Sequence, residues 1–199
     1  VPGFLGYNGF PNSLCISVNE QVVHGIPSSY RLKNGDIVSI DCGTYMHGFY
    51  GDSAYTFAVG EVDEEKKLLM QVTKEALIKG AEQACVGKRT GDIGYAVQHH
   101  AESFGFGVVR ELIGHGLGKN MHEDPFVPMY GRAGTGIKLD AGMTLAIEPM
   151  INLGVPDVEV LDDGWTVATA DGQVSCHVEH TVAVFEDHTE VLTDLNYKK

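Results

Sequence analysis

The sequence predicts a single α+β domain over residues 1–199, in which a central antiparallel sheet carries helices on its outer side. Three observations predict this class. The length fits one domain with a substantial core. The 25 glycines fall mostly between short apolar runs, as expected where tight turns join many strands. Two segments with helical periodicity follow each other near the middle of the chain.

A hairpin is expected after a turn-rich stretch of about thirty residues. Residues 36–45 form its first strand and residues 50–59 its return strand, with a turn near Met46-His47-Gly48. If the turn centres on positions 46 and 47, Asp41 lies opposite Asp52.

Two helices are expected next. Residues 63–85 form the first, with Asp63 as its N-cap and an apolar stripe that includes Leu68 and Leu69. Thr90 caps the second, and Gly105 closes it. The remaining chain alternates apolar runs with turns, which predicts strands at 143–150, 159–161, 165–170 and 178–185.

The net charge of −13 argues against a stable complex with nucleic acid, because an acidic surface repels phosphate. The nearest basic clusters, Lys66-Lys67 and Lys88-Arg89, hold two charges each. The four cysteines show no CxxC spacing and are too sparse for a disulfide scaffold, so reduced thiols in a cytosolic protein are expected. No signal peptide or apolar run of membrane-spanning length is seen.

Four acids interrupt apolar runs that are expected to be strands: Asp41, Asp52, Glu148 and Glu179. Burying an unpaired charge is costly, so each one alone reads as an edge residue or a salt-bridge partner. Together with His115 in a glycine-rich loop, however, they would need five separate explanations. An oxygen-rich set with one imidazole suits divalent cations, and an acid shared by two ions suits a dinuclear site. The sequence therefore predicts a metal centre.

Seven motif blocks follow one another along the chain: Val22-Val23-His24-Gly25-Ile26-Pro27, Ile40-Asp41-Cys42-Gly43, Gly51-Asp52-Ser53, Gly114-His115-Gly116-Leu117-Gly118, His122-Glu123-Asp124-Pro125, Ile147-Glu148-Pro149-Met150 and Val178-Glu179-His180-Thr181. In order and spacing they resemble the type I methionine aminopeptidases over essentially the whole chain. The resemblance implies the pita-bread fold, with the metals in the concave face of the sheet.

The resemblance also implies a role for each metal ligand. Asp41 would chelate the first ion, Asp52 and Glu179 would bridge both, and His115 and Glu148 would bind the second. Two divalent ions per chain are implied, drawn from Co, Mn, Fe, Zn or Ni.

Three residues take catalytic roles by the same resemblance. Glu148 would accept a proton from the attacking water, His122 would bind the scissile carbonyl, and His24 would lie near the leaving nitrogen. A pocket for the methionine side chain would be lined by Tyr7, Phe10, Cys15, Met121 and Trp165. Ordinary core packing is the alternative for the last group, most of all for Phe10 and Met121.

The implied activity is metal-dependent removal of the N-terminal methionine from peptides and nascent proteins, with preference for a small second residue. The implied partners are peptide N-termini, with transient ribosome association allowed and no membrane or stable nucleic acid. A cytoplasmic monomer is expected.

The chain departs from the family pattern in four places. A segment that normally precedes Leu5-Gly6-Tyr7 is missing, Asn8 replaces a frequent histidine, and Lys119 replaces a common arginine. His177 stands where glutamine is common, two residues before Glu179, and a regular strand would place both on one face.

Two alternatives stay open at this stage. Aminopeptidase P and prolidase relatives share the fold and the five ligands, but they usually carry a large N-terminal domain. A non-catalytic pita-bread protein that binds partners would generally have lost ligands, and none is lost here.

Overall fold

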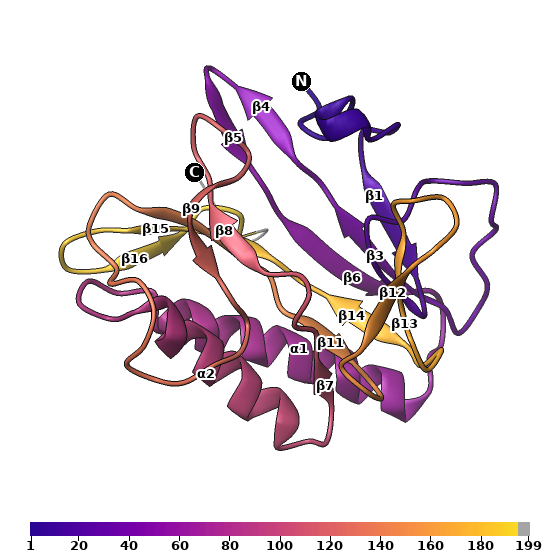
Figure 1. The fold of residues 1–199 in the computed structure, drawn as a ribbon. Helices are drawn as coiled ribbons and strands as arrows, with labels where there is room; N and C mark the ends of the chain where they lie inside the picture. Colours follow the sequence, from indigo (N-terminus) through magenta and orange to yellow (C-terminus); the bar gives the residue numbers. More distant parts are fainter. Residues whose placement is uncertain (195–199) are drawn as a thin grey trace.

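The computed structural model describes residues 1–194 and has an α+β fold, with strands above and two helices below in the view of Figure 1. The predicted class is confirmed. The sheet is built from several small antiparallel sheets rather than one continuous sheet. One three-stranded sheet has the order β1 (Cys15–Val18), β3 (Ile37–Asp41), β6 (Ala54–Ala58). The five-stranded sheet has the order β16 (Thr189–Val191), β15 (His180–Val184), β10 (Thr144–Ile147), β8 (Gly114–Gly116), β9 (Glu123–Val127).

Three smaller sheets complete the strands. One has the order β14 (Ser175–His177), β11 (Met150–Asn152), β7 (Gly107–Val108). Another has the order β12 (Val158–Val160), β13 (Val167–Thr169), β2 (Gln21–Val23). A hairpin of β4 (Thr44–Met46) and β5 (Phe49–Gly51) stands apart, and a short 3₁₀ helix, η1 (Tyr7–Gly9), lies near the N-terminus.

The first long hairpin passes from β3–β6 into β4–β5 without a change of register. Its turn is His47-Gly48, where both residues have positive φ (52° and 89°), as a tight two-residue turn requires. The predicted opposition of Asp41 and Asp52 is therefore wrong by two residues, and Asp41 pairs with Ala54. Asp52 lies between β5 and β6, two residues before Ala54, so it sits diagonally across the hairpin from Asp41.

The second long hairpin is formed by residues 144–152 and 175–184, and it also passes from one sheet into another. Ile147 pairs with His180 in one sheet and Met150 pairs with His177 in the next, so the register continues across the break. The predicted strands at 143–150 and 178–185 are thus interrupted at residues 148–149 and begin later, at His180. Pro149 has no backbone N–H to give to a ladder, which accounts for the break on that side.

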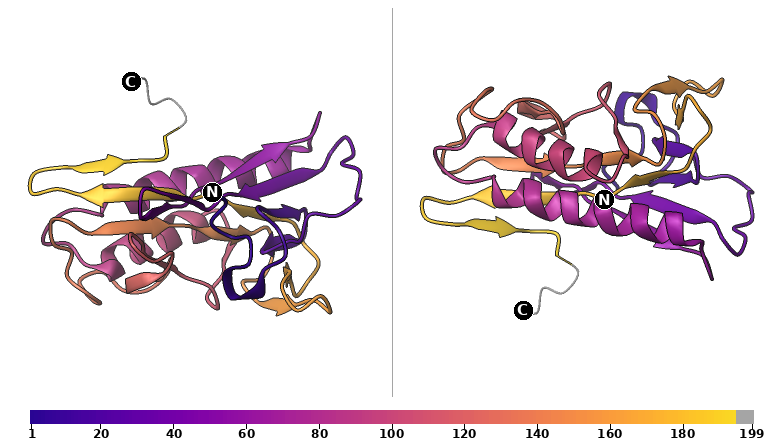
Figure 2. Two further views of the ribbon diagram at one scale, coloured as in Figure 1. Left: turned by 90° about the horizontal axis from the view of Figure 1, so that it is seen from above. Right: turned by 90° about the horizontal axis from the view of Figure 1, so that it is seen from below.

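Helices α1 (Glu64–Glu82) and α2 (Thr90–Glu102) lie side by side beneath the strands, as both views of Figure 2 show. Gly80 marks their close approach, because a Cβ there would lie 2.8 Å from Cγ2 of Val97. The main core fills the space between the helices and the strands, with Leu69, Val97 and Ile147 fully buried. The outer helices and inner strands match the predicted layering.

The predicted N-cap of α1 is confirmed, whereas the predicted N-cap of α2 is wrong. The Asp63 carboxylate accepts a hydrogen bond from Lys66 N at 2.8 Å, as predicted for an N-cap, while α1 ends three residues before Cys85. Thr90 is the first helical residue rather than the cap, because its hydroxyl accepts from Ile137 N instead.

Replacing Asp63 with alanine is expected to lower the free energy of unfolding by about 1 kcal/mol, the usual value of an N-cap. The Lys66 N–H holds the pKa of the Asp63 carboxyl below its ordinary value. Its stabilisation is therefore present above the unfolded-state pKa and is lost as the pH falls through the folded-state pKa. Urea unfolding at pH 7 and pH 3 checks this. If the free energies of unfolding of wild type and Asp63→Ala differed by the same amount at both pH values, the prediction would be contradicted.

Candidate metal and substrate site

A cavity of about 210 Å³ opens on the strand side of the molecule. Every residue predicted for the site lines it: Tyr7, Phe10, Cys15, His24, Asp41, Asp52, His115, Met121, His122, Glu148, Trp165 and Glu179. These residues come from positions 7 to 179 of the chain, so the fold alone brings them together.

Three acids gather at one end of this cavity. Asp41, Asp52 and Glu179 each offer a carboxylate oxygen within 4.8 Å of the others. Burial raises the pKa of Asp52 to about 7. The pKa values of Asp41 and Glu179 are raised well above normal, first by burial and then by neighbouring carboxylates. Such a cluster of buried like charges is stable only with protons or cations among the oxygens.

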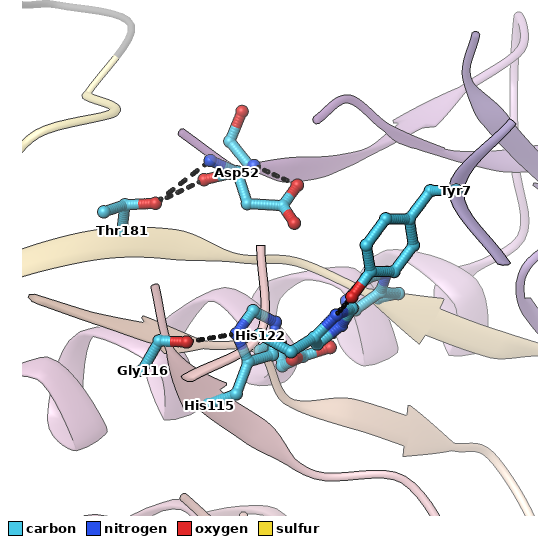
Figure 3. A network of polar contacts seen from close by, with 9 residues as sticks. Tyr7, Asp52, His115, Gly116, His122 and Thr181 are labelled. Atoms are coloured by element: carbon cyan, nitrogen blue, oxygen red, sulfur yellow. Dashed lines mark hydrogen bonds and ion pairs between the residues drawn. The ribbon is translucent and has the colours of Figure 1, made fainter. Parts of the chain in front are cut away.

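Backbone contacts fix these acids to both long hairpins, as Figure 3 shows for Asp52. The Thr181 hydroxyl donates to Asp52 O at 2.7 Å and accepts from Asp52 N at 3.3 Å. Glu179 N donates to Ala54 O at 2.8 Å. The two hairpins therefore meet at their breaks, and each delivers two acids. Sequence reasoning missed Thr181, since nothing in its motif indicates that it ties the hairpins together.

His115 presents a free lone pair to the cavity. Its Nδ1 lies 2.8 Å from Gly116 O, and because a carbonyl only accepts, Nδ1 carries the proton (Figure 3). Burial lowers the pKa of His115 to about 4, so the ring is neutral and Nε2 is an acceptor. That Nε2 lies 3.6 Å from Oε1 of Glu148, which is also an acceptor when ionised. Two acceptors face each other, as two ligands of one cation do.

Two observations indicate that these residues can hold a divalent metal ion. Buried oxygens of Asp41 (Oδ1) and Glu179 (Oε1) have no hydrogen-bond partner among residues 1–194, which leaves them for an ion. Four carboxylates and one imidazole are the donor chemistry that hard and borderline divalent ions prefer.

Two further histidines line the cavity beside the acids. His122 Nδ1 lies 2.7 Å from the Tyr7 hydroxyl, and its ring centroid lies 4.2 Å from that of His115. His24 adopts φ 59°, an uncommon conformation for a histidine. Burial lowers the pKa of both His24 and His122, so neutral rings are favoured at pH 7.

The other end of the cavity is apolar. Phe4, Phe10, Cys15 and Met121 form a buried cluster separate from the main core, with Tyr7 and Trp165 packed against it. The Phe10 ring meets Trp165 edge-on at 5.2 Å between centroids. Sequence reasoning missed Phe4, Leu112 and Ile113, which also line the cavity, because apolar loop residues carry no distinguishing pattern.

The positions that depart from the family pattern lie in different places. Asn8 lines the cavity and Lys119 is exposed. The regular strand that was expected to join His177 to Glu179 is absent, because the break falls between them. His177 nevertheless lies near the site, with Nε2 3.7 Å from Oε2 of Glu148.

Comparisons with known proteins show the family and the fold. The model of metallopeptidase family M24 matches residues 3–186. A methionine aminopeptidase of Clostridium perfringens is 56% identical over 192 residues, covering 96% of this chain and 77% of that protein. The crystal structure of a methionine aminopeptidase from Rickettsia prowazekii superposes with a TM-score of 0.96 at 46% identity, covering 98% of this chain and 79% of that one.

A more distant likeness concerns the fold alone. The prolidase from Pyrococcus horikoshii OT3 superposes with a TM-score of 0.74 at 23% identity, covering 93% of this chain and 48% of that one. Among the described residues, no helix has the length and apolar character needed to cross a membrane.

Proposed function

This chain belongs to the methionine aminopeptidases of metallopeptidase family M24, and on that basis we propose that it hydrolyses the peptide bond after an N-terminal methionine. Peptides and nascent proteins with a small second residue are its proposed substrates. One observation carries the proposal, namely that a single cavity joins a buried acid cluster to a soft, apolar pocket. Aromatic rings and a methionine suit a flexible thioether side chain.

The proposed metal ligands are the five residues at the acid end. Asp41 would serve one ion and His115 and Glu148 the other, with Asp52 and Glu179 available to both. When bound, the ions would supply a water of lowered pKa as the nucleophile at neutral pH. Co, Mn, Fe, Zn and Ni all suit this donor set, and availability selects among them.

The chain's own residues then handle protons and orientation. Glu148 takes the proton of the attacking water, the role that the family resemblance implies, and its half-buried carboxylate lies on the cavity wall. The Tyr7 hydroxyl donates to His122 Nδ1 at 2.7 Å in the tautomer that leaves the proton on Nε2. His122 can then donate to the scissile carbonyl as negative charge develops on its oxygen.

The metal site would also select the substrate's end. A free α-amine has a lone pair that the ion held by His115 and Glu148 would attract, whereas the lone pair of an internal peptide nitrogen is delocalised into its carbonyl group. Cleavage is therefore confined to the first residue. His24, neutral and on the cavity wall, is placed to stabilise the leaving nitrogen.

Replacing His24 with asparagine is expected to lower kcat on Met-Ala-Ser by about 100-fold or more, as for the loss of an acid–base group. Asparagine tolerates the left-handed φ of 59° better than alanine does, so the backbone is preserved. His47→Asn is the matched control, since His47 also has positive φ (52°) but lies in an exposed turn. Equal turnover in the two variants would remove His24 from the mechanism.

The proposed function is tested by hydrolysis of Met-Ala-Ser, Met-Leu-Ser and Ala-Pro-Ala by metal-stripped protein with Co²⁺ or Mn²⁺ added back. Metal-dependent release of methionine from Met-Ala-Ser alone is the expected result. Cleavage of the proline peptide alone would move the chain to the aminopeptidase P branch. No cleavage with any metal would favour a binding protein.

The compartment and the oligomeric state of the protein are also proposed. All four cysteines are free thiols, which supports a reducing compartment such as the cytoplasm. We infer a monomer that meets peptide N-termini as they emerge, with at most transient ribosome contact.

A further inference from the structure

The carboxylate of Glu148 lies between two imidazoles, one facing each oxygen. His115 Nε2 is 3.6 Å from Oε1, and His177 Nε2 is 3.7 Å from Oε2. The two rings differ in place and chemistry. His115 lines the cavity and presents a lone pair, whereas His177 is buried beside Glu148 and is not among the residues that line the cavity.

The His177 ring is held in a buried position. The residue is 1% exposed, and its Nε2 has no hydrogen-bond partner among the described residues. Its backbone is fixed from two sides, because His177 O accepts from the Thr56 hydroxyl at 2.6 Å and His177 pairs with Met150 across β11 and β14. A buried polar nitrogen that lacks a hydrogen-bond partner destabilises the folded state, because it has lost its contact with water. Oε2 of Glu148 lies 3.7 Å from that nitrogen.

Glu148, rather than His177, has the freedom to move and shorten the distance between Oε2 and His177 Nε2. Its side chain retains 16% exposure toward the cavity, whereas the His177 side chain retains 2%. A gap of 3.7 Å needs a shift of about 0.8 Å to reach the usual length of a charge-assisted hydrogen bond. Such a shift moves Oε2 toward His177 and leaves Oε1 directed at His115 and the cavity.

We propose that His177 is a positioning residue for Glu148, which donates from Nε2–H to Oε2 and so fixes the direction in which Oε1 points. The proposal rests on the function proposed above, in which Glu148 is both ligand and proton acceptor. His177 acts through Glu148 and does not itself touch substrate. A carboxylate held at one oxygen presents the other in one orientation, which is how residues behind a ligand tune a metal site.

The test compares His177→Gln with His177→Leu. Glutamine carries an N–H donor at the same ε position, whereas leucine fills similar space without a donor. His177→Leu is expected to lower kcat on Met-Ala-Ser and the affinity for Co²⁺ about 10- to 100-fold each, with KM nearly unchanged. His177→Gln is expected to stay within about threefold of wild type on both measures. Wild-type values in His177→Leu, or equal losses in both variants, would overturn the proposal.

The Co²⁺ titration keeps this proposal separate from the proposed function. If wild type cleaves no peptide, the function fails, yet the Co²⁺ affinities of the two variants still decide the role of His177. If His177→Leu does not fold, ¹⁵N-histidine NMR of wild type decides instead. A proton on Nε2 of His177 supports the proposal, and a proton on Nδ1 alone overturns it.

Discussion

The Asp52→Asn protein is expected to cleave Met-Ala-Ser at least about 1,000-fold more slowly than wild type, a loss of about 4 kcal/mol of transition-state stabilisation. Its affinity for Co²⁺ is expected to fall as well. An amide nitrogen cannot bridge ions, and Asp52 is the acid placed between the two hairpin breaks. Stopped assays with saturating Co²⁺ and calorimetric titration measure the two losses.

The same substitution has the opposite effect on the metal-free chain. Burial raises the pKa of Asp52 to about 7, so its ionised form is destabilised among Asp41 and Glu179. Metal-free Asp52→Asn should therefore unfold at a temperature equal to or above that of metal-free wild type at pH 8. Asp162→Asn, in an exposed loop, is the control and should change neither property. An Asp52→Asn protein that kept full turnover would exclude Asp52 from the centre.

Replacing Leu69 with alanine is expected to lower the free energy of unfolding by about 2–5 kcal/mol. Leu69 is fully buried in the main core between α1 and the strands, so its removal leaves a cavity. Leu68 is the matched control, because it is the adjacent residue of the same helix and is 40% exposed. Leu68→Ala should cost no more than about 0.5 kcal/mol, as is usual for surface positions.

Urea unfolding of both leucine variants gives the comparison directly. Similar losses in the two proteins would mean that α1 does not pack as described. Helical periodicity predicts Leu68 and Leu69 in one apolar stripe, and only the packing of α1 shows that Leu69 is buried and Leu68 exposed.

The chemistry of the site could be predicted more fully than its geometry. Acids inside apolar runs stand out because burying an ionised carboxylate is costly, and that signal identified Asp41, Asp52, Glu148 and Glu179. All four line the cavity, as does His115. The roles given to them rest on the resemblance and remain proposals.

The register of the first hairpin could not be predicted from the apolar pattern. An error of two residues leaves every side chain on the same face, so period-two patterning cannot detect it. The positive φ of His47 and Gly48 decides the register, and histidine is not a strong signal for such a turn.

The strand breaks were also missed, although they position the acids. Apolar residues continue on both sides of Glu148 and of Glu179, so each run looks like one strand. The structure shows that each hairpin leaves one sheet and enters another at its acids. The position of His177 beside Glu148 follows from this break, and alternation along a regular strand could not have predicted it.

We propose that the acid cluster binds two ions and that hydrolysis depends on them. The most direct measurement titrates Co²⁺ into metal-stripped protein by calorimetry and follows methionine release from Met-Ala-Ser in the same samples. Two ions per chain are expected, with activity absent at the start and rising as the sites fill. Hydrolysis that is unchanged in the metal-stripped protein, or a chain that binds no Co²⁺, would contradict the claim.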